Sequence, residues 1–407
     1  GSTDFDFSND DFSQFLESED VVKSRRQFGA LNLSQEINNK LNISAYGIFS
    51  KTKEETFVQA INRYNTFTEI SERSSATDNS LGIGHIKAVY LPNLTDHWYF
   101  KTQFKKTEKE FANNINSVVD TINNTFITQE DVAGSFLNQS IEWHRKSSRE
   151  HTFSFAVNYT YEERTPETLW ETSDRILQGL IPVVEQPVYR LNQLKRVRNN
   201  QFDAIFKHYW VLNKNNHIYS TLGDTYLNQQ FFTRDFQQLD DGNINDFTEG
   251  NFGNDLDFSL NDLFLGLHYK FQLGIFSFDQ GLFLHHYQWT VSQQSIISKN
   301  KTVVLPGFSA EAKLSQTKEM EFNYRLQTSF SDASKFASRY YLSSYNSVHQ
   351  GNENLENGLS HNFNLRYNKF STFRGFMYYA FVNYIERARW VGNWVNDEGI
   401  KQSVLPL

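Results

Sequence analysis

Hydrophobic and polar residues alternate along much of the chain, which places one set of side chains on each face of an extended strand. The stretch 153–161, for example, puts Phe153, Phe155 and Val157 on one face and Ser154 on the other. The same period of two occurs at 263–271, 322–330 and 363–367. This pattern predicts β-strands rather than helices.

The pattern predicts about fourteen strands, most of them longer than the five or six residues of a typical globular strand. A tilted strand that crosses a membrane needs roughly 9–11 residues, which fits these lengths better. The predicted strands are 28–37, 41–50, 80–91, 97–107, 133–145, 151–162, 200–212, 217–229, 259–272, 275–290, 302–315, 319–331, 359–370 and 374–388.

The predicted connections alternate between short turns and long polar stretches. Short turns such as Asn38-Asn39-Lys40, Leu273-Gly274 and Ser371-Thr372-Phe373 alternate with long loops at 51–79, 108–132, 163–199, 230–258 and 332–358. Short turns on one rim and long loops on the other are typical of outer-membrane barrels. The fold class we expect is therefore all-β, an antiparallel meander of long transmembrane-type strands that forms part or all of such a barrel.

In a barrel wall, the two faces of each strand meet different surroundings. We expect lipid on the side of Phe153, Phe155, Val157, Phe322, Tyr324, Leu326, Phe363 and Leu365. We expect the lumen on the side of Asn323, Arg325, Gln327, Asn364 and Arg366. Aromatic residues near the short turns, including Trp98, Trp143 and Trp210, resemble an interfacial girdle.

Composition agrees with this interpretation. Aromatic residues make up 16% of the 407 residues, only 6 are proline and none is cysteine. Phe and Tyr favour strands, whereas proline would remove ladder hydrogen bonds. The net charge of −8 argues against a nucleic-acid partner, whose phosphates require a basic face. The missing cysteines exclude disulfides, thiolate metal sites and cysteine nucleophiles.

The sequence offers little candidate chemistry. No Ser, His and acid stand apart as a catalytic set, so we predict no enzyme, no catalytic residue and no cofactor. No histidine pair has the spacing of a metal site, and the weak candidate for calcium is the oxygen-rich set Asp240, Asp241, Asp246 and Glu249. Its spacing does not fit a helix-flanked calcium loop, and a solvated polar loop is the alternative.

One region resembles a known family. Val304-Leu305-Pro306-Gly307-Phe308, the strand from Phe322 to Phe330, and Gly351-Asn352-Glu353-Asn354-Leu355-Glu356-Asn357-Gly358 follow one another before a new strand pair. This order resembles the barrel of TonB-dependent outer-membrane receptors, especially the SusC-like Bacteroidetes type with a regulatory-like N-terminal domain. That family has Gly-Asn-Pro-x-Leu-Lys-Pro-Glu, where this chain has Glu353 for the first Pro, Glu356-Asn357 for Lys-Pro and Gly358 for Glu.

The resemblance implies an outer-membrane receptor that imports a scarce nutrient and is energised through TonB by a plug domain. It also implies partners: outer-membrane lipid, the TonB complex, a surface lipoprotein, and a small ligand such as a siderophore, glycan or peptide. No plug precedes Phe28, and the chain ends Pro406-Leu407 rather than on an aromatic residue. We therefore expect a connector at 1–27 and a barrel portion at 28–407, without the plug and the last strands.

Ligand contact is expected from the loops 163–199 and 230–258, because loops on a rigid scaffold commonly bind ligands. The candidate residues are Trp170, Tyr189, Phe247 and Phe252, which alternatively only pack the loops together. Two other functions stay open at this point. One is a soluble or surface-exposed β-sandwich or propeller that binds a partner, and the other is a passive porin.

Overall fold

The computed structural model describes residues 21–63, 68–119, 122–173, 179–371, 375–396 and 400–406. Nearly all of these residues lie in β-strands. The elements are β1 (Val21–Asn38), β2 (Leu41–Arg63), β3 (Thr68–Tyr90), β4 (Asp96–Val119), β5 (Ile122–Lys146), β6 (His151–Thr172), β7 (Tyr189–Asn213), β8 (Asn216–Gln238), β9 (Ile244–Asp246), η1 (Phe247–Gly250), β10 (Asn254–Leu273), β11 (Phe276–Ser292), β12 (Ile296–Ser315), β13 (Lys318–Ser329), α2 (Ala333–Phe336), β14 (Tyr341–Ser344), β15 (Ser347–Gln350), β16 (Gly358–Ser371), β17 (Phe376–Arg389), β18 (Val391–Asn396) and β19 (Ile400–Pro406).

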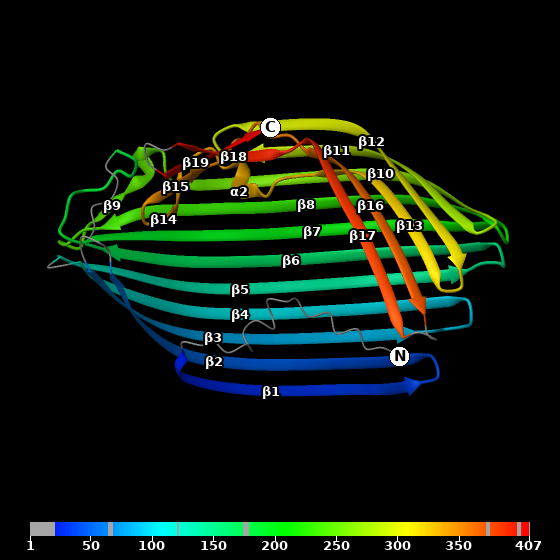
Figure 1. Cartoon of the computed structure of the whole chain (residues 1–407), viewed down its shortest axis with the longest axis horizontal. Helices are drawn as coiled ribbons and strands as arrows, with labels where there is room; N and C mark the ends of the chain where they lie inside the picture. Colours follow the sequence, from blue (N-terminus) through cyan, green and yellow to red (C-terminus); the bar gives the residue numbers. More distant parts are fainter. Residues whose placement is uncertain are drawn as a thin grey trace.

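The described strands form one 15-stranded antiparallel sheet whose neighbours follow one another in chain order from β1 to β17. The short strand β9 pairs with β8, and β14, β15, β19 and β18 form a separate four-stranded sheet. Figure 1 shows β16 and β17 crossing the line of β3–β8 at a steep angle. Each predicted strand overlaps one strand of the large sheet. The predicted antiparallel meander of long strands is therefore confirmed.

The prediction of long loops between the strands is wrong in most places. Residues 51–63 and 68–79 continue β2 and β3, and 108–119 continue β4. The stretches 163–199 and 230–258 likewise extend β6, β7, β8 and β10. The extensions of β2–β5 carry polar residues on both faces, so their sequences lack the alternation that marks a strand with one apolar face.

The connector predicted at 1–27 is also too long. Strand β1 begins at Val21, and Lys23 to Phe28 pair with Glu55 to Ser50 of β2. Residues 1–20 of the predicted connector, and part of the predicted turn 371–373, lie outside the described residues.

The two faces of the sheet have different surroundings. We call inner the face that carries Phe231 and Phe258, because α2 and β14 pack against it. The ring of Phe336 stacks on Phe258 at 4.8 Å between centroids, and Tyr341 meets Phe231 edge-on at 5.2 Å. The opposite face is the outer face.

Apolar side chains form a continuous row across the outer face. Phe155 on β6 lies directly opposite Trp143 on β5 and Phe206 on β7. Through the same register the row continues along β8, β10, β11 and β12 as Leu222, Leu265, Leu284 and Val304. From Phe155 to Val304 these side chains are all exposed. We use the name outer apolar band for this row together with the outer-face residues that continue it along each strand. The band extends to the short turns in one direction and to Tyr159 in the other.

The outer apolar band ends where the strands continue. Tyr159, Phe202 and Tyr226 form a row that becomes polar at Asn261 and Gln288. Beyond this row β8 continues to Gln238, so the strand projects past the band on the side away from the short turns. Figure 1 shows the short turns gathered at the right end of the sheet and β9, β14 and β15 toward the left. An exposed apolar band bordered by polar strand extensions is typical of the wall of a membrane barrel.

The predicted alternation of side chains between two faces is confirmed, and the assignment of these faces to lipid and lumen stays a prediction. Phe155 is exposed on the outer face while its neighbour Ser154 is buried on the inner face. Tyr324 lies opposite Phe308 and Phe363, which continues the outer face into β13 and β16. The residues predicted for the lumen, Asn323, Arg325, Gln327, Asn364 and Arg366, occupy the alternate positions. Within the described ranges no second sheet covers the apolar face, which argues against a β-sandwich or propeller.

The large sheet is not closed within the described residues. Its order starts at β1 and ends at β17, and these two strands do not pair with each other there. Unpaired backbone groups are costly in hydrocarbon, so we expect both edges to be paired when the protein is in a membrane.

Glycine on the inner wall makes room for aromatic rings of the neighbouring strand. A Cβ at Gly266 would lie 2.2 Å from the ring of Phe283, and a Cβ at Gly223 would lie 2.2 Å from the ring of Phe264. The rings therefore occupy the space that a side chain at these glycines would fill.

Replacing Gly266 by alanine is expected to destabilise the protein by about 1–3 kcal/mol, because the ring of Phe283 must leave its place. Gly47→Ala is the control, since its Cβ would meet nothing closer than the Ile83 carbonyl at 3.9 Å. Thermal unfolding in detergent, followed by gel mobility, measures both variants. Equal midpoints for the two variants would contradict the packing role of Gly266.

Candidate functional site

The connection between β13 and β16 folds onto the inner face of the sheet. We call residues 330–357 the insert; it contains α2, β14 and β15. Phe336 is buried against Phe258, and Leu355 and Ala337 are buried in the same cluster. The stretch 332–358 was predicted as a long polar loop. It instead forms a folded element with its own apolar core contacts.

A second apolar cluster joins the insert to β6, β7 and the connection between β8 and β10. It contains all four residues predicted to contact ligand, and all four are buried. The exposed fraction of the residue is 8% for Trp170, 6% for Tyr189, 0% for Phe247 and 1% for Phe252. Leu342 and Val348 of the insert pack in the same cluster. Their burial favours the packing role over the ligand contact that the sequence suggested.

Two amide side chains, one at the start of β10 and one directly after β11, bind the backbone of the insert near residue 339. Asn254 accepts hydrogen bonds through Oδ1 from Gln293 Nε2 at 2.8 Å and from the Arg339 amide at 3.3 Å. Gln293 Oε1 in turn accepts a hydrogen bond from the Ser338 amide at 3.0 Å. The backbone of the insert is thereby fixed to the sheet by specific polar contacts.

A buried carboxyl group fixes strand β14. Asp235 on β8 accepts hydrogen bonds through Oδ1 from Gln193 Nε2 at 2.8 Å and from the Leu342 amide at 3.3 Å. Gln193 also donates to the Leu342 carbonyl at 2.7 Å. Asp235 lies nine residues beyond Tyr226 on β8 and therefore outside the outer apolar band. Burial raises the pKa of Asp235 to about 7.

The far end of the insert is held by charge. Glu356 pairs with Lys301 of β12 at 3.2 Å and with Arg389 of β17 at 2.7 Å. The hydrogen bond from Lys301 holds the pKa of Glu356 below its usual range. Lys299 donates to the Asn354 carbonyl at 2.8 Å. The insert is thus anchored to β12 and β17, the strands that flank β13 and β16.

The candidate calcium ligands are engaged elsewhere. Asp240 pairs with Arg190 at 2.9 Å, and Asp241 accepts hydrogen bonds from Asn243. Asp246 pairs with Arg234 at 2.9 Å and caps η1. Glu249 lies in η1 itself. Across the described part of the chain, no three His, Asp or Glu side chains are grouped so that they could hold a metal ion.

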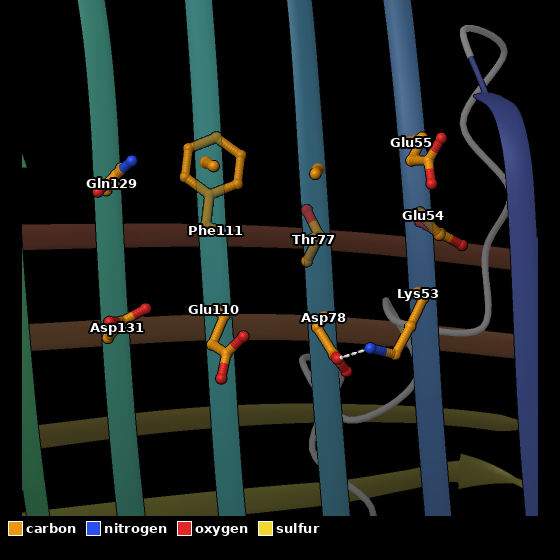
Figure 2. Close-up of a pocket in the computed structure, with 11 residues that line it drawn as sticks. Lys53, Glu54, Glu55, Thr77, Asp78, Glu110, Phe111, Gln129 and Asp131 are labelled. Atoms are coloured by element: carbon orange, nitrogen blue, oxygen red, sulfur yellow. Dashed lines mark ion pairs between the residues drawn. The ribbon is translucent and has the colours of Figure 1, made fainter.

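A shallow hollow of about 380 Å³ lies over the extensions of β2–β5. Figure 2 shows Lys53, Asp78, Glu110 and Asp131 side by side across four strands, with an ion pair between Lys53 and Asp78. The register continues the outer face, well beyond the apolar band. The hydrogen bond from Lys53 lowers the pKa of Asp78. The row is charged rather than apolar, and we assign it no ligand.

No helix in the described ranges is both long and apolar enough to cross a membrane. No family model matches the chain, and no curated protein matches it.

Solved structures that match this chain include two outer-membrane proteins, both with TM-scores below 0.5. The ferric citrate transporter FecA in its unliganded form is 11% identical, with a TM-score of 0.46 over 86% of this chain and 49% of that chain. The ferric-catecholate import receptor Fiu from E. coli K12 is 7% identical, with a TM-score of 0.31 over 95% of this chain and 79% of that chain. This chain therefore spans about half the length of the FecA chain it matches. At these identities and TM-scores, the two structures carry no argument about this chain.

Proposed function

We propose that the chain is the barrel portion of an outer-membrane active-transport receptor for a scarce nutrient, energised through TonB by a plug domain. The observation that carries the membrane part of this proposal is the outer apolar band. Exposed Phe206, Leu222 and Leu265 form one row on a face that no other element of the described chain covers. Lipid is the partner that makes such a surface stable, because apolar area removed from water contributes roughly 25 cal/mol per Å².

The aromatic and polar residues around the band support the same proposal. Trp98 and Trp143 pair on the outer face at the short-turn end, with ring centroids 5.9 Å apart. Tyr159 and Tyr226 lie at the opposite border of the band. Aromatic side chains of this kind favour the two membrane–water interfaces. The short turns would then face the periplasm and the strand extensions the cell exterior.

The insert supports a gated receptor rather than an open pore. It packs on the inner face at the level of the extensions, where it makes two apolar clusters with the sheet. In a closed barrel, a folded element at this position would narrow the lumen from the exterior side. The predicted ligands are a siderophore, glycan or peptide, and a surface lipoprotein is the predicted partner for the SusC-like type. A ligand would reach Trp170 or Phe252 only if the second cluster opened.

Uptake that depends on TonB tests the transport proposal. Cells that produce the full-length receptor should take up its nutrient, and deletion of TonB should abolish that uptake. Growth on the nutrient at limiting concentration, with and without TonB, measures it. Equal uptake in cells lacking TonB would instead support the passive porin.

A further inference from the structure

A polar cluster is buried between β7, β8 and strand β14 of the insert. Asp235 is 1% exposed and Gln193 is 7% exposed. Oδ1 of Asp235 accepts both hydrogen bonds, from Gln193 and from the Leu342 amide. Oδ2 is buried as well and has no hydrogen-bond partner in the described part of the chain. A buried carboxylate oxygen without a donor is costly, whereas a protonated carboxyl group avoids burying the charge.

The surroundings do not neutralise the carboxylate by a direct ion pair among the described residues. The charge of Lys195 on β7 favours the ionised form, but its ammonium group lies over the rings of Phe231 at 5.6 Å and Tyr341 at 5.8 Å. Asp246 on β9 opposes the charge and is itself paired with Arg234. On the insert, His349 of β15 contacts Tyr341 at 5.2 Å between ring centroids.

We propose that Asp235 is an acid-sensitive latch that holds the insert against the inner face of the sheet. When the carboxyl group is protonated, β14 docks without burying a charge. When it is ionised, docking places an incompletely solvated carboxylate beneath Leu342, and the insert is released more often. This inference concerns the conformation of the insert and does not depend on transport through TonB.

The sign follows from the two states of the insert. In the docked state burial raises the pKa of Asp235 to about 7, from an ordinary value of 3.8. An undocked insert exposes the carboxyl group, so the docked state binds the proton more tightly. Docking is therefore strongest at low pH and weakens by about tenfold per pH unit as pH rises toward 7, above which it levels off. The low pKa of Glu356 acts in the opposite sense, and only at a more acidic pH.

Hydrogen exchange of peptides that contain Leu342 tests the latch in the full-length protein in outer-membrane vesicles. The protection factor, corrected for the intrinsic effect of pH on exchange, should fall by about tenfold or more between pH 5 and pH 7. Asp235→Asn keeps an oxygen to accept both hydrogen bonds and cannot ionise, so its protection should not change with pH. Asp257→Asn, on the exposed outer face of β10, is the matched control and should retain the wild-type dependence.

His349 is the other group whose ordinary pKa lies near this range, so His349→Gln is measured beside Asp235→Asn. The latch predicts that His349→Gln retains most of the pH dependence. Wild-type protection that is constant between pH 5 and pH 8 would overturn the proposal without any variant. Loss of the dependence in His349→Gln together with its persistence in Asp235→Asn would overturn it as well.

Discussion

Ile141→Arg is expected to cost about 2–4 kcal/mol of folding free energy in a membrane, because the new charge would stand on the lipid-facing side of the wall. Ile141 on β5 lies between Phe100 of β4 and Val157 of β6, in the middle of the outer apolar band. An arginine side chain at this position points away from the polar residues of the inner face. Its guanidinium group could reach water only by extending along the outer face.

Ser140→Arg is the matched control, since Ser140 is the next residue of the same strand and points to the inner face beside Lys101 and Asn158. Denaturant unfolding of both variants from lipid vesicles measures the difference. We expect Ser140→Arg to retain most of the wild-type stability. An equal loss for the two variants would contradict the assignment of the outer face to lipid.

Phe336→Ala should release the insert while leaving the large sheet intact. The side chain is 1% exposed and stacks on Phe258, and removal of a buried phenylalanine ring costs about 3–5 kcal/mol. Lys335 and Arg339 in the insert are trypsin sites, so cleavage near residue 337 reports release. The large sheet should still resist trypsin, because its backbone stays paired from β5 to β12.

Phe57→Ala is the control for this experiment, because Phe57 is an exposed phenylalanine on the extension of β2. It should leave the tryptic pattern of the insert unchanged. Resistance of Phe336→Ala to trypsin at the insert, at the wild-type level, would show that the stacked pair does not hold the insert.

The strands that cross the band were predictable because two different surroundings meet at each of them. Alternation such as Phe153, Ser154, Phe155 records a wall with one apolar face, and the register confirms it. Turns were equally visible, since Asn and Gly cluster where a hairpin closes, as at Leu273-Gly274. In these regions local sequence and tertiary surroundings favour the same structure.

The extensions were not predictable by the same rule. In β4, the run from Lys105 to Glu110 continues the strand with charged residues on both faces. Such a run has neither an apolar face nor a turn residue to mark where the strand ends. Backbone pairing with β3 and β5 maintains it, and pairing with neighbours leaves no signal in a single sequence.

The candidate site illustrates a similar limit. Trp170 and Phe252 stood out as large aromatics in polar stretches, yet their partners Leu342 and Val348 lie far along the chain. The sequence does not distinguish Asp235 from the many other acids, because its surroundings come from Gln193 of β7 and from the backbone of the insert. Its one signal is the alternation of Phe231, Thr233 and Asp235, all buried on the inner face, within an otherwise polar stretch.

The lipid exposure of single positions on β6 tests the central claim most directly. The chain has no cysteine, so a nitroxide label can be placed at one cysteine at a time from residue 153 to residue 160 in the full-length protein in outer-membrane vesicles. Collision with oxygen, which concentrates in lipid, should be high at 153, 155, 157 and 159, and collision with a water-soluble nickel complex should be high at 156, 158 and 160. Position 154, which is buried on the inner face, should resist both reagents. Equal access of the nickel complex to both sets, or protection of the odd set from both reagents, would contradict a membrane wall.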